Sequence, residues 1–199
     1  KNGSLTFFSF SPFAEVNSKA SCAPSTGITI TEWEVNGHQE VDLMVADVQT
    51  GRTANESNGG YDGVPTIFRH KLSQIVDIVF KTDKDYNDGA PFENGDKQFF
   101  INYVKFNKLE ETGTYVSGND VNGTNLGAWT LPSPATYDGV YTWFEENSAC
   151  DTEFKKAGTS ANDMTYLLMM PQTFVDDADA KTVSNIEVKY TIRTHTSGS

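Results

Sequence analysis

Three histidines are the side chains of this sequence best suited to acid–base chemistry near neutral pH: His38, His70 and His195. None of them lies in an HExxH zinc motif, and the sequence holds no GxSxG nucleophile motif. A Ser-His-Asp triad is recognised by geometry, so its absence cannot be read from sequence, but nothing in the spacing supports one. We therefore predict no catalytic residue.

His70 stands out because it shares a register with apolar residues in the stretch 64-VPTIFRHKLSQIVDIVF-80. Every second residue from Val64 is mainly apolar, the period of a strand with one buried face, yet this register also carries His70 and Gln74. We expect both to be buried polar groups that hydrogen-bond backbone atoms. Since the stretch is long for one strand, we expect a break between Lys71 and Ser73.

A possible calcium loop begins at 83-DKDYNDG-89, where Asp83, Asp85 and Asn87 place oxygen atoms at the first, third and fifth positions. An EF-hand loop needs glycine at its sixth position and glutamate at its twelfth. Here the glycine is seventh and the twelfth residue is asparagine. We favour a solvated turn between two strands, and predict neither a metal nor a cofactor.

The three tryptophans, Trp33, Trp129 and Trp143, offer aromatic surface for a sugar. The alternation around Trp33 and Trp143 is equally typical of a strand core, and we favour the core for these two. Trp129 lies in a loop-rich stretch and is expected to be the most exposed. Paired carboxylates for glycoside hydrolysis give no signal, because with 27 acidic residues some pair arises by chance.

Composition narrows the class of partner. The 199-residue chain carries a net charge of −12, which repels phosphate backbones and argues against nucleic acid. It has no apolar run of about 18 residues, the length needed for a membrane-spanning helix. Cys22 and Cys150 are the only cysteines, so a thiolate zinc site is not expected. A single disulfide and two separate thiols both remain open.

The elements that must position these residues are predominantly strands. Alternating or apolar runs predict them, in addition to 64–80, at 4–11, 27–33, 41–48, 98–106, 113–118, 127–131, 139–146, 165–174 and 185–193. Turn clusters rich in Gly, Asn, Asp and Pro separate them at 50–63, 82–96, 117–125 and 132–139. This pattern predicts an all-β sandwich or barrel without long helices.

The turn-rich break from Thr50 to Gly63 is the best candidate for a domain boundary. It leaves about three strands before it, which are few for a complete sandwich. Because the chain begins at Lys1 and soon enters strand-like sequence, we expect a processed or truncated product.

Three motif groups follow one another along the chain: 5-LTFFSFSPF-13 with 41-VDLMVA-46, then 68-FRHKLSQIVDIVF-80, then 167-LLMMPQTF-174 with 186-IEVKYTI-192. Together, and in this order, they resemble the fimbrillin-like family, the pilus subunits and surface adhesins called type V pilins of Gram-negative anaerobes. The resemblance spans nearly the whole chain.

The resemblance implies two transthyretin-like (Greek-key) β-sandwich domains, the first incomplete here, and no catalytic residues. On this mapping residues 1–62 would be the C-terminal part of the first β-sandwich domain and residues 63–199 would be the second. It implies an exported lipoprotein precursor of the outer membrane that becomes part of a pilus. Its partners would be other pilin subunits, joined by strand exchange, and a host or bacterial surface protein or glycan. A role as stalk, tip or anchor is left open.

Our hypothesis is thus a non-enzymatic cell-surface pilus subunit or adhesin that assembles by β-strand addition. The alternation of Ile186, Val188, Tyr190 and Ile192 suits a strand able to pair on either edge. The alternative is a glycan-binding surface lipoprotein that presents Trp129. A calcium-dependent hydrolase is a remote third reading.

Overall fold

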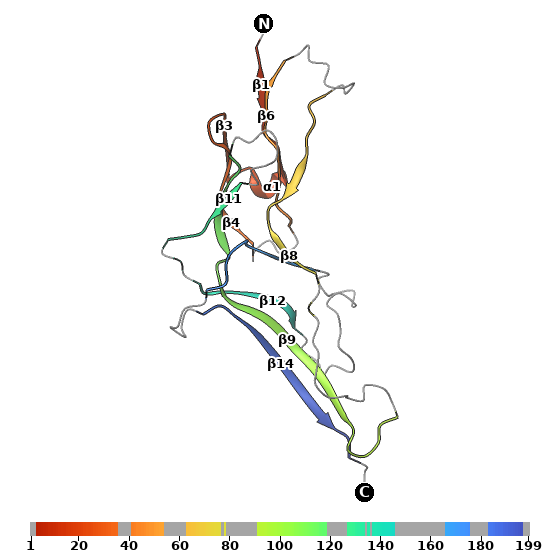
Figure 1. Cartoon of the computed structure of the whole chain (residues 1–199). Helices are drawn as coiled ribbons and strands as arrows, with labels where there is room; N and C mark the ends of the chain where they lie inside the picture. Colours follow the sequence, from red (N-terminus) through yellow and green to blue (C-terminus); the bar gives the residue numbers. More distant parts are fainter. Residues whose placement is uncertain are drawn as a thin grey trace. The chain divides into compact units, whose positions relative to one another are not determined.

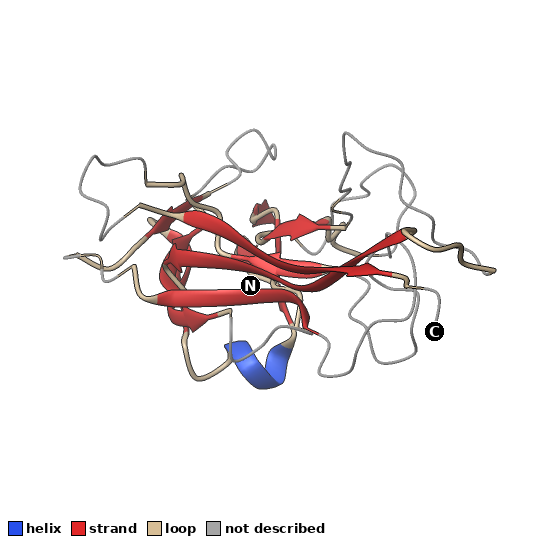
Figure 2. Cartoon of the chain, turned by 90° about the horizontal axis from the view of Figure 1, so that it is seen from below, coloured by secondary structure: helices blue, strands red, loops and turns tan. Residues whose placement is uncertain are grey.

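The computed structural model describes residues 3–35, 41–53, 63–76, 78, 91–118, 127–133, 135, 137–145, 166–175 and 183–196. Within these ranges strands dominate, and the one helix is the short α1 (Phe13–Val16), as Figure 2 shows. The predicted all-β class is confirmed, whereas the transthyretin-like Greek-key topology stays a prediction. No described helix is long and apolar enough to cross a membrane.

The chain divides into two compact units, each assembled from separate segments. Unit 1 comprises residues 1–73, 110–136 and 168–171, and unit 2 comprises residues 74–109, 137–167 and 172–199. The predicted division into domains 1–62 and 63–199 stays a prediction.

Antiparallel sheets form unit 1 (Figure 1). A four-stranded sheet has the order β11 (Ala128–Thr130), β10 (Thr112–Val116), β4 (Gly27–Glu34), β3 (Ala20–Ala23). A three-stranded sheet has the order β2 (Phe10–Ser11), β5 (Met44–Ala46), β7 (Phe68–His70). A further pair joins β1 (Leu5–Phe7) to β6 (Gln49–Arg52).

A bulge in β4 places Trp33 in the core of unit 1. Simple alternation would put Trp33 on the face opposite Ile28 and Ile30, yet all three are fully buried. Between them Glu32 has a φ of 50°, and the pairing of β4 with β10 shifts register at this point. An extra residue in one strand reverses the faces beyond it, so the tryptophan turns inward. The prediction that Trp33 is a core residue is confirmed.

In unit 2 the long strand β9 (Lys97–Leu109) lies between β12 (Gly139–Glu145) and β14 (Asn185–Thr194). Figure 1 shows the three as neighbouring arrows. The buried side chains of this unit include Val104, Phe106, Tyr141 and Trp143, which confirms the core prediction for Trp143. A further two-stranded sheet pairs β8 (Ser73–Ile75) with β13 (Leu167–Met169), and the boundaries of the two units fall within these strands.

Most predicted strands are present, but three elements were missed: α1, β3 and β6. β3 has the sequence ASCA, which lacks the bulky alternating residues of a strand signal. β6 extends from Gln49 to Arg52 and overlaps the predicted turn cluster 50–63, so the turn prediction is wrong for residues 50–52. α1 has only four residues and buries only Val16, so it leaves no periodic pattern.

Candidate functional site

His70 is exposed, and the prediction that it faces the core is wrong. Its side chain is 72% exposed, and its Nδ1 atom hydrogen-bonds the carboxylate of Asp42. Gln74, on β8, is exposed as well, which corrects the same prediction for that residue. The predicted break is confirmed, because β7 ends at His70 and β8 begins at Ser73.

His70 is exposed because Arg69, its neighbour in the chain, takes the less exposed position on β7. Arg69 pairs with Val45 of β5, and its guanidinium forms a two-pronged ion pair with Asp47. The Nε–Oδ1 distance is 2.8 Å and the Nη2–Oδ2 distance is 3.0 Å. A fork of this kind satisfies both charges, so the polar register turns toward the body of the unit while Phe68 and His70 face solvent.

Next to this ion pair, Lys71, Tyr115 and Trp129 form a contiguous group within unit 1. The Lys71 ammonium lies 5.3 Å from the centre of the Tyr115 ring, and that ring lies 5.4 Å from Trp129. Trp129 is half-buried, and its indole N–H donates to the Lys71 carbonyl at 2.7 Å. Sequence reasoning missed this contact, since it joins residues far apart in the chain. This hydrogen bond connects β11 to the residue that follows β7, so Trp129 has a structural role in unit 1.

The surroundings of this group shift the pKa values of Tyr115, Lys71 and Arg69. Burial, and secondarily the charge of Asp47, raise the pKa of Tyr115 to about 12. Burial lowers the pKa of Lys71, and the hydrogen bonds that Arg69 donates to Asp47 raise the pKa of Arg69. Tyr115 therefore stays a neutral phenol, and Arg69 stays a cation locked to its carboxylate.

The other candidate residues carry no assembled centre in the described part of the chain. No group of three or more His, Cys, Asp or Glu side chains there is placed to hold a metal. Asp83, Asp85 and Asn87 of the calcium candidate, His38, and Cys150 lie outside the described residues. Cys22 lies exposed on β3 with a free thiol, and His195 hydrogen-bonds Gln98 at 2.8 Å.

One face of the β9–β14 pair carries a polar ladder centred on Tyr103. Its hydroxyl donates to one carboxylate oxygen of Glu187, and Asn107 donates to the other at 3.2 Å. The ammonium groups of Lys105 and Lys189 lie 4.8 and 5.7 Å from the Tyr103 ring centre. The hydrogen bond from Tyr103 holds the pKa of Glu187 below its usual value. These contacts fix the position of Glu187 on the strand.

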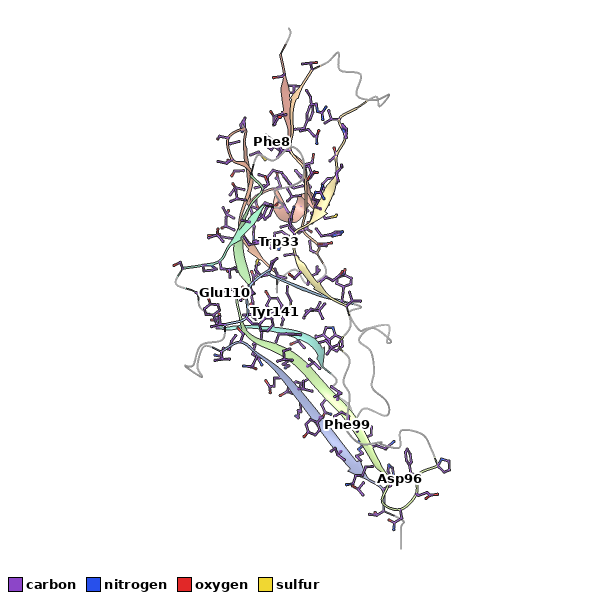
Figure 3. All side chains as sticks on the ribbon, in the orientation of Figure 1. Phe8, Trp33, Asp96, Phe99, Glu110 and Tyr141 are labelled. Atoms are coloured by element: carbon purple, nitrogen blue, oxygen red, sulfur yellow. The ribbon has the colours of Figure 1, made fainter. Side chains whose placement is uncertain are left out.

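The opposite face of β14 is apolar and uncovered. Ile186, Tyr190 and Ile192 are 54%, 57% and 44% exposed, and Tyr190 stacks on Phe99 with ring centres 5.2 Å apart. Figure 3 labels Phe99 on the stretch of β9 that borders β14. β14 thus differs from the core strands, because its apolar residues alternate with polar ones but are not buried.

A bulge in β9 keeps this apolar face continuous. Lys189 pairs with Tyr103 and Tyr190 pairs with Ile101, so Asn102 is the extra residue and lies in β9. β14 itself alternates without interruption. The four buried residues of β9 that lie nearest Asn102 are all even-numbered: Gln98, Phe100, Val104 and Phe106. The bulge therefore places the first two and the last two on opposite faces of the β9–β14 pair.

β14 is also the outer strand of its sheet. β9 pairs with it along its whole length, from Asn185↔Asn107 to Thr194↔Lys97, and no strand in the described ranges lies on its other side. We call this side, from Asn185 to Thr194, the β14 edge. It presents backbone N–H and C=O groups beside an exposed apolar face, and among the described strands it is the edge best suited to add a strand.

Comparison with known proteins identifies the family. A family model described as Fimbrillin-like matches residues 1–198. Searches of curated proteins and of solved structures found no match. The matched family consists of structural pilus subunits rather than enzymes, which assemble with other pilin subunits at the cell surface. With nearly every residue matched and an all-β fold, the chain belongs to the fimbrillin-like family.

Proposed function

We propose that this chain is a subunit or adhesin of a pilus that joins its neighbours by β-strand addition. The observation that carries the proposal is the family match over residues 1–198. The proposal extends to export as an outer-membrane lipoprotein precursor and to binding of a host or bacterial surface protein or glycan. It contains no catalytic step.

Strand addition is supported by the contrast between β14 and the other outer strands of the described sheets. Natural sheet edges are protected by short strands, prolines or charges. The outer strands β2, β3, β7 and β11 of unit 1 have two, four, three and three residues, and β12, the other outer strand of the β14 sheet, has seven. β14 has ten residues and contains no proline. A strand of this length offers an incoming strand a full row of hydrogen bonds.

Immunogold electron microscopy on surface-sheared material from the source cells tests the assembly. Gold along thin filaments is the expected result for a stalk subunit, and gold confined to filament ends indicates a tip or anchor. Gold that stays on the cell envelope, with no labelled filament, contradicts the proposal.

A lysine at the β14 edge tests the strand-addition step. Tyr190→Lys places a charge on the exposed apolar face, a device that natural edges use against pairing. We expect fewer or shorter filaments. Ile67→Lys is the matched control, since Ile67 is 55% exposed in unit 1 and undergoes the same kind of change away from β14. Equal filament yields from both variants would argue against the β14 edge.

The glycan-binding alternative requires Trp129 to present its ring to a sugar. The side chain of Trp129 is half-buried, and its N–H donates to the Lys71 carbonyl. Both observations favour a packing role over sugar binding. A glycan array with the wild-type chain and Trp129→Ala decides the point: binding that disappears in a variant that remains folded would favour the alternative.

A further inference from the structure

We propose that β14 of one chain pairs edge to edge with β14 of a second copy, antiparallel, about a two-fold axis at Tyr190. The pairing joins two three-stranded sheets into one continuous sheet. It is an isologous contact, so it closes on a dimer and adds no third copy.

The first support is the regularity of β14. In an antiparallel pair, residues directly opposite each other lie on the same face. Because the bulge is in β9, the even-numbered residues of β14 share one face and the odd-numbered residues share the other. A self-pairing must therefore place even opposite even and odd opposite odd. This leaves a few registers, whose axes differ by one residue.

Charge decides among these registers. An axis at Lys189 places two Lys189 residues opposite each other, and an axis at Thr191 places Lys189 opposite Arg193. Both arrangements set like charges face to face, which destabilises a sheet. An axis at Val188 pairs Glu187 with Lys189 but leaves the end of the strand, including Ile192, without a partner. These three registers are weaker than the fourth.

The register with its axis at Tyr190 is complementary throughout. Glu187 lies opposite Arg193 at both ends, Val188 lies opposite Ile192 at two places, and Tyr190 lies opposite its own copy. Lys189 faces the neutral Thr191. The run from Ile186 to Thr194 is paired along its whole length. Tyr190 and Ile192 meet apolar or aromatic side chains of the other copy, and Ile186 faces Thr194.

Both charged partners are held in place before the pairing forms. Tyr103 and Asn107 hydrogen-bond the two carboxylate oxygens of Glu187. The guanidinium of Arg193 lies 4.8 Å from the centre of the Phe100 ring. Because Glu187 and Arg193 are both odd-numbered, they lie on the same face, and little side-chain freedom is lost when they meet across the axis.

The consequence for assembly rests on the proposed function, whereas the pairing itself does not. In a pilus subunit that has not yet assembled, the self-pairing occupies the β14 edge until a donor strand displaces it. Since an exposed edge of this length invites uncontrolled association, a closed dimer limits that association to two copies.

Sedimentation equilibrium of the purified chain tests the pairing, with thermal melting to show that each variant is folded. We expect a wild-type dimer. Glu187→Arg and Arg193→Glu each set like charges opposite each other at both ends, and each alone is expected to raise the dimer dissociation constant at least about tenfold. Lys189→Glu is the matched control: it makes the same size of charge change but faces Thr191, so the dimer is retained.

An equimolar mixture of the Glu187→Arg and Arg193→Glu variants gives the sharpest result. In the mixed dimer each arginine of the first variant meets a glutamate of the second, so native mass spectrometry should show a heterodimer although neither variant dimerises alone. The double variant Glu187→Arg/Arg193→Glu should dimerise like the wild type.

Three outcomes overturn the inference: a wild-type chain that is monomeric at every concentration at which it is soluble, single variants that dimerise like the wild type, or a mixture that forms no heterodimer. A monomeric wild type that still enters filaments removes this inference and leaves the proposed function intact. A β14-dependent dimer of the purified chain, combined with source cells that show no labelled filament, removes the proposed function and leaves this inference intact.

Discussion

Gly27→Ala is expected to lower the free energy of unfolding by about 3 kcal/mol, through two separable costs. Gly27 opens β4 with a φ of +77°, a left-handed conformation that costs an L-residue about 1–2 kcal/mol. An added Cβ would also lie 2.0 Å from the Gly118 carbonyl oxygen and 2.3 Å from Ser117 Oγ. A contact that close to backbone forces the two segments apart.

The separation threatens two hydrogen bonds that join β4 to the end of β10. The N–H of Ile28 donates to Ser117 Oγ at 2.8 Å, and the N–H of Ser117 donates to the Ile28 carbonyl at 2.9 Å. A typical hydrogen bond contributes about 1 kcal/mol net. Weakening both therefore adds about 1–2 kcal/mol to the backbone cost.

Gly51→Ala is the matched control, because Gly51 has a φ of +68° but an added Cβ would meet nothing within 4 Å. Gly51→Ala therefore carries the backbone cost alone, about 1–2 kcal/mol. Urea denaturation followed by circular dichroism measures both variants against the wild type. Equal losses for the two would refute the crowding argument, and a negligible loss at Gly51 would refute the conformational one.

Three further outcomes follow from the contacts in unit 1. His70→Ala should change the free energy of unfolding by less than about 0.5 kcal/mol, because His70 and its partner Asp42 form an exposed pair; a loss above about 1 kcal/mol would mean that His70 is buried after all. Trp129→Phe should cost about 1–2 kcal/mol in urea, since the Lys71 carbonyl loses its donor, while an unchanged stability would leave the ring free for a ligand. For Tyr115, the folded pKa of about 12 lies above the ordinary value of 10.0, so its contribution to stability is complete below pH 10 and lost as the pH rises toward 12; urea midpoints across this range should fall less in Tyr115→Phe than in the wild type.

Local patterns predicted much of the fold. The strand at 185–193 was placed correctly because alternation has a period of two, which depends on neighbouring residues alone. The break after His70 was also predicted, since a run longer than an ordinary strand must be interrupted. β3 escaped notice because small residues carry little pattern.

The face that each residue presents was less predictable. Arg69 rather than His70 takes the less exposed position because Asp47, in the segment between β5 and β6, offers a two-pronged partner. The position of Trp33 depended on a bulge at Glu32, which no alternation rule anticipates. The ion pair joins residues that are 22 positions apart, and the bulge appears only in the pairing of β4 with β10, so the pattern of a single strand reveals neither.

The sequence by itself determined the all-β class, the family and the alternating strand that ends the described chain, because these follow from short-range periodicity and from ordered motifs. Tertiary structure alone decided that β14 is an outer strand, that the bulge falls in β9 at Asn102, and that Ile186, Tyr190 and Ile192 stay exposed on one continuous face. The physical reason is that sheet order and register depend on hydrogen bonds between distant residues, and a one-residue shift moves every side chain beyond it to the other face.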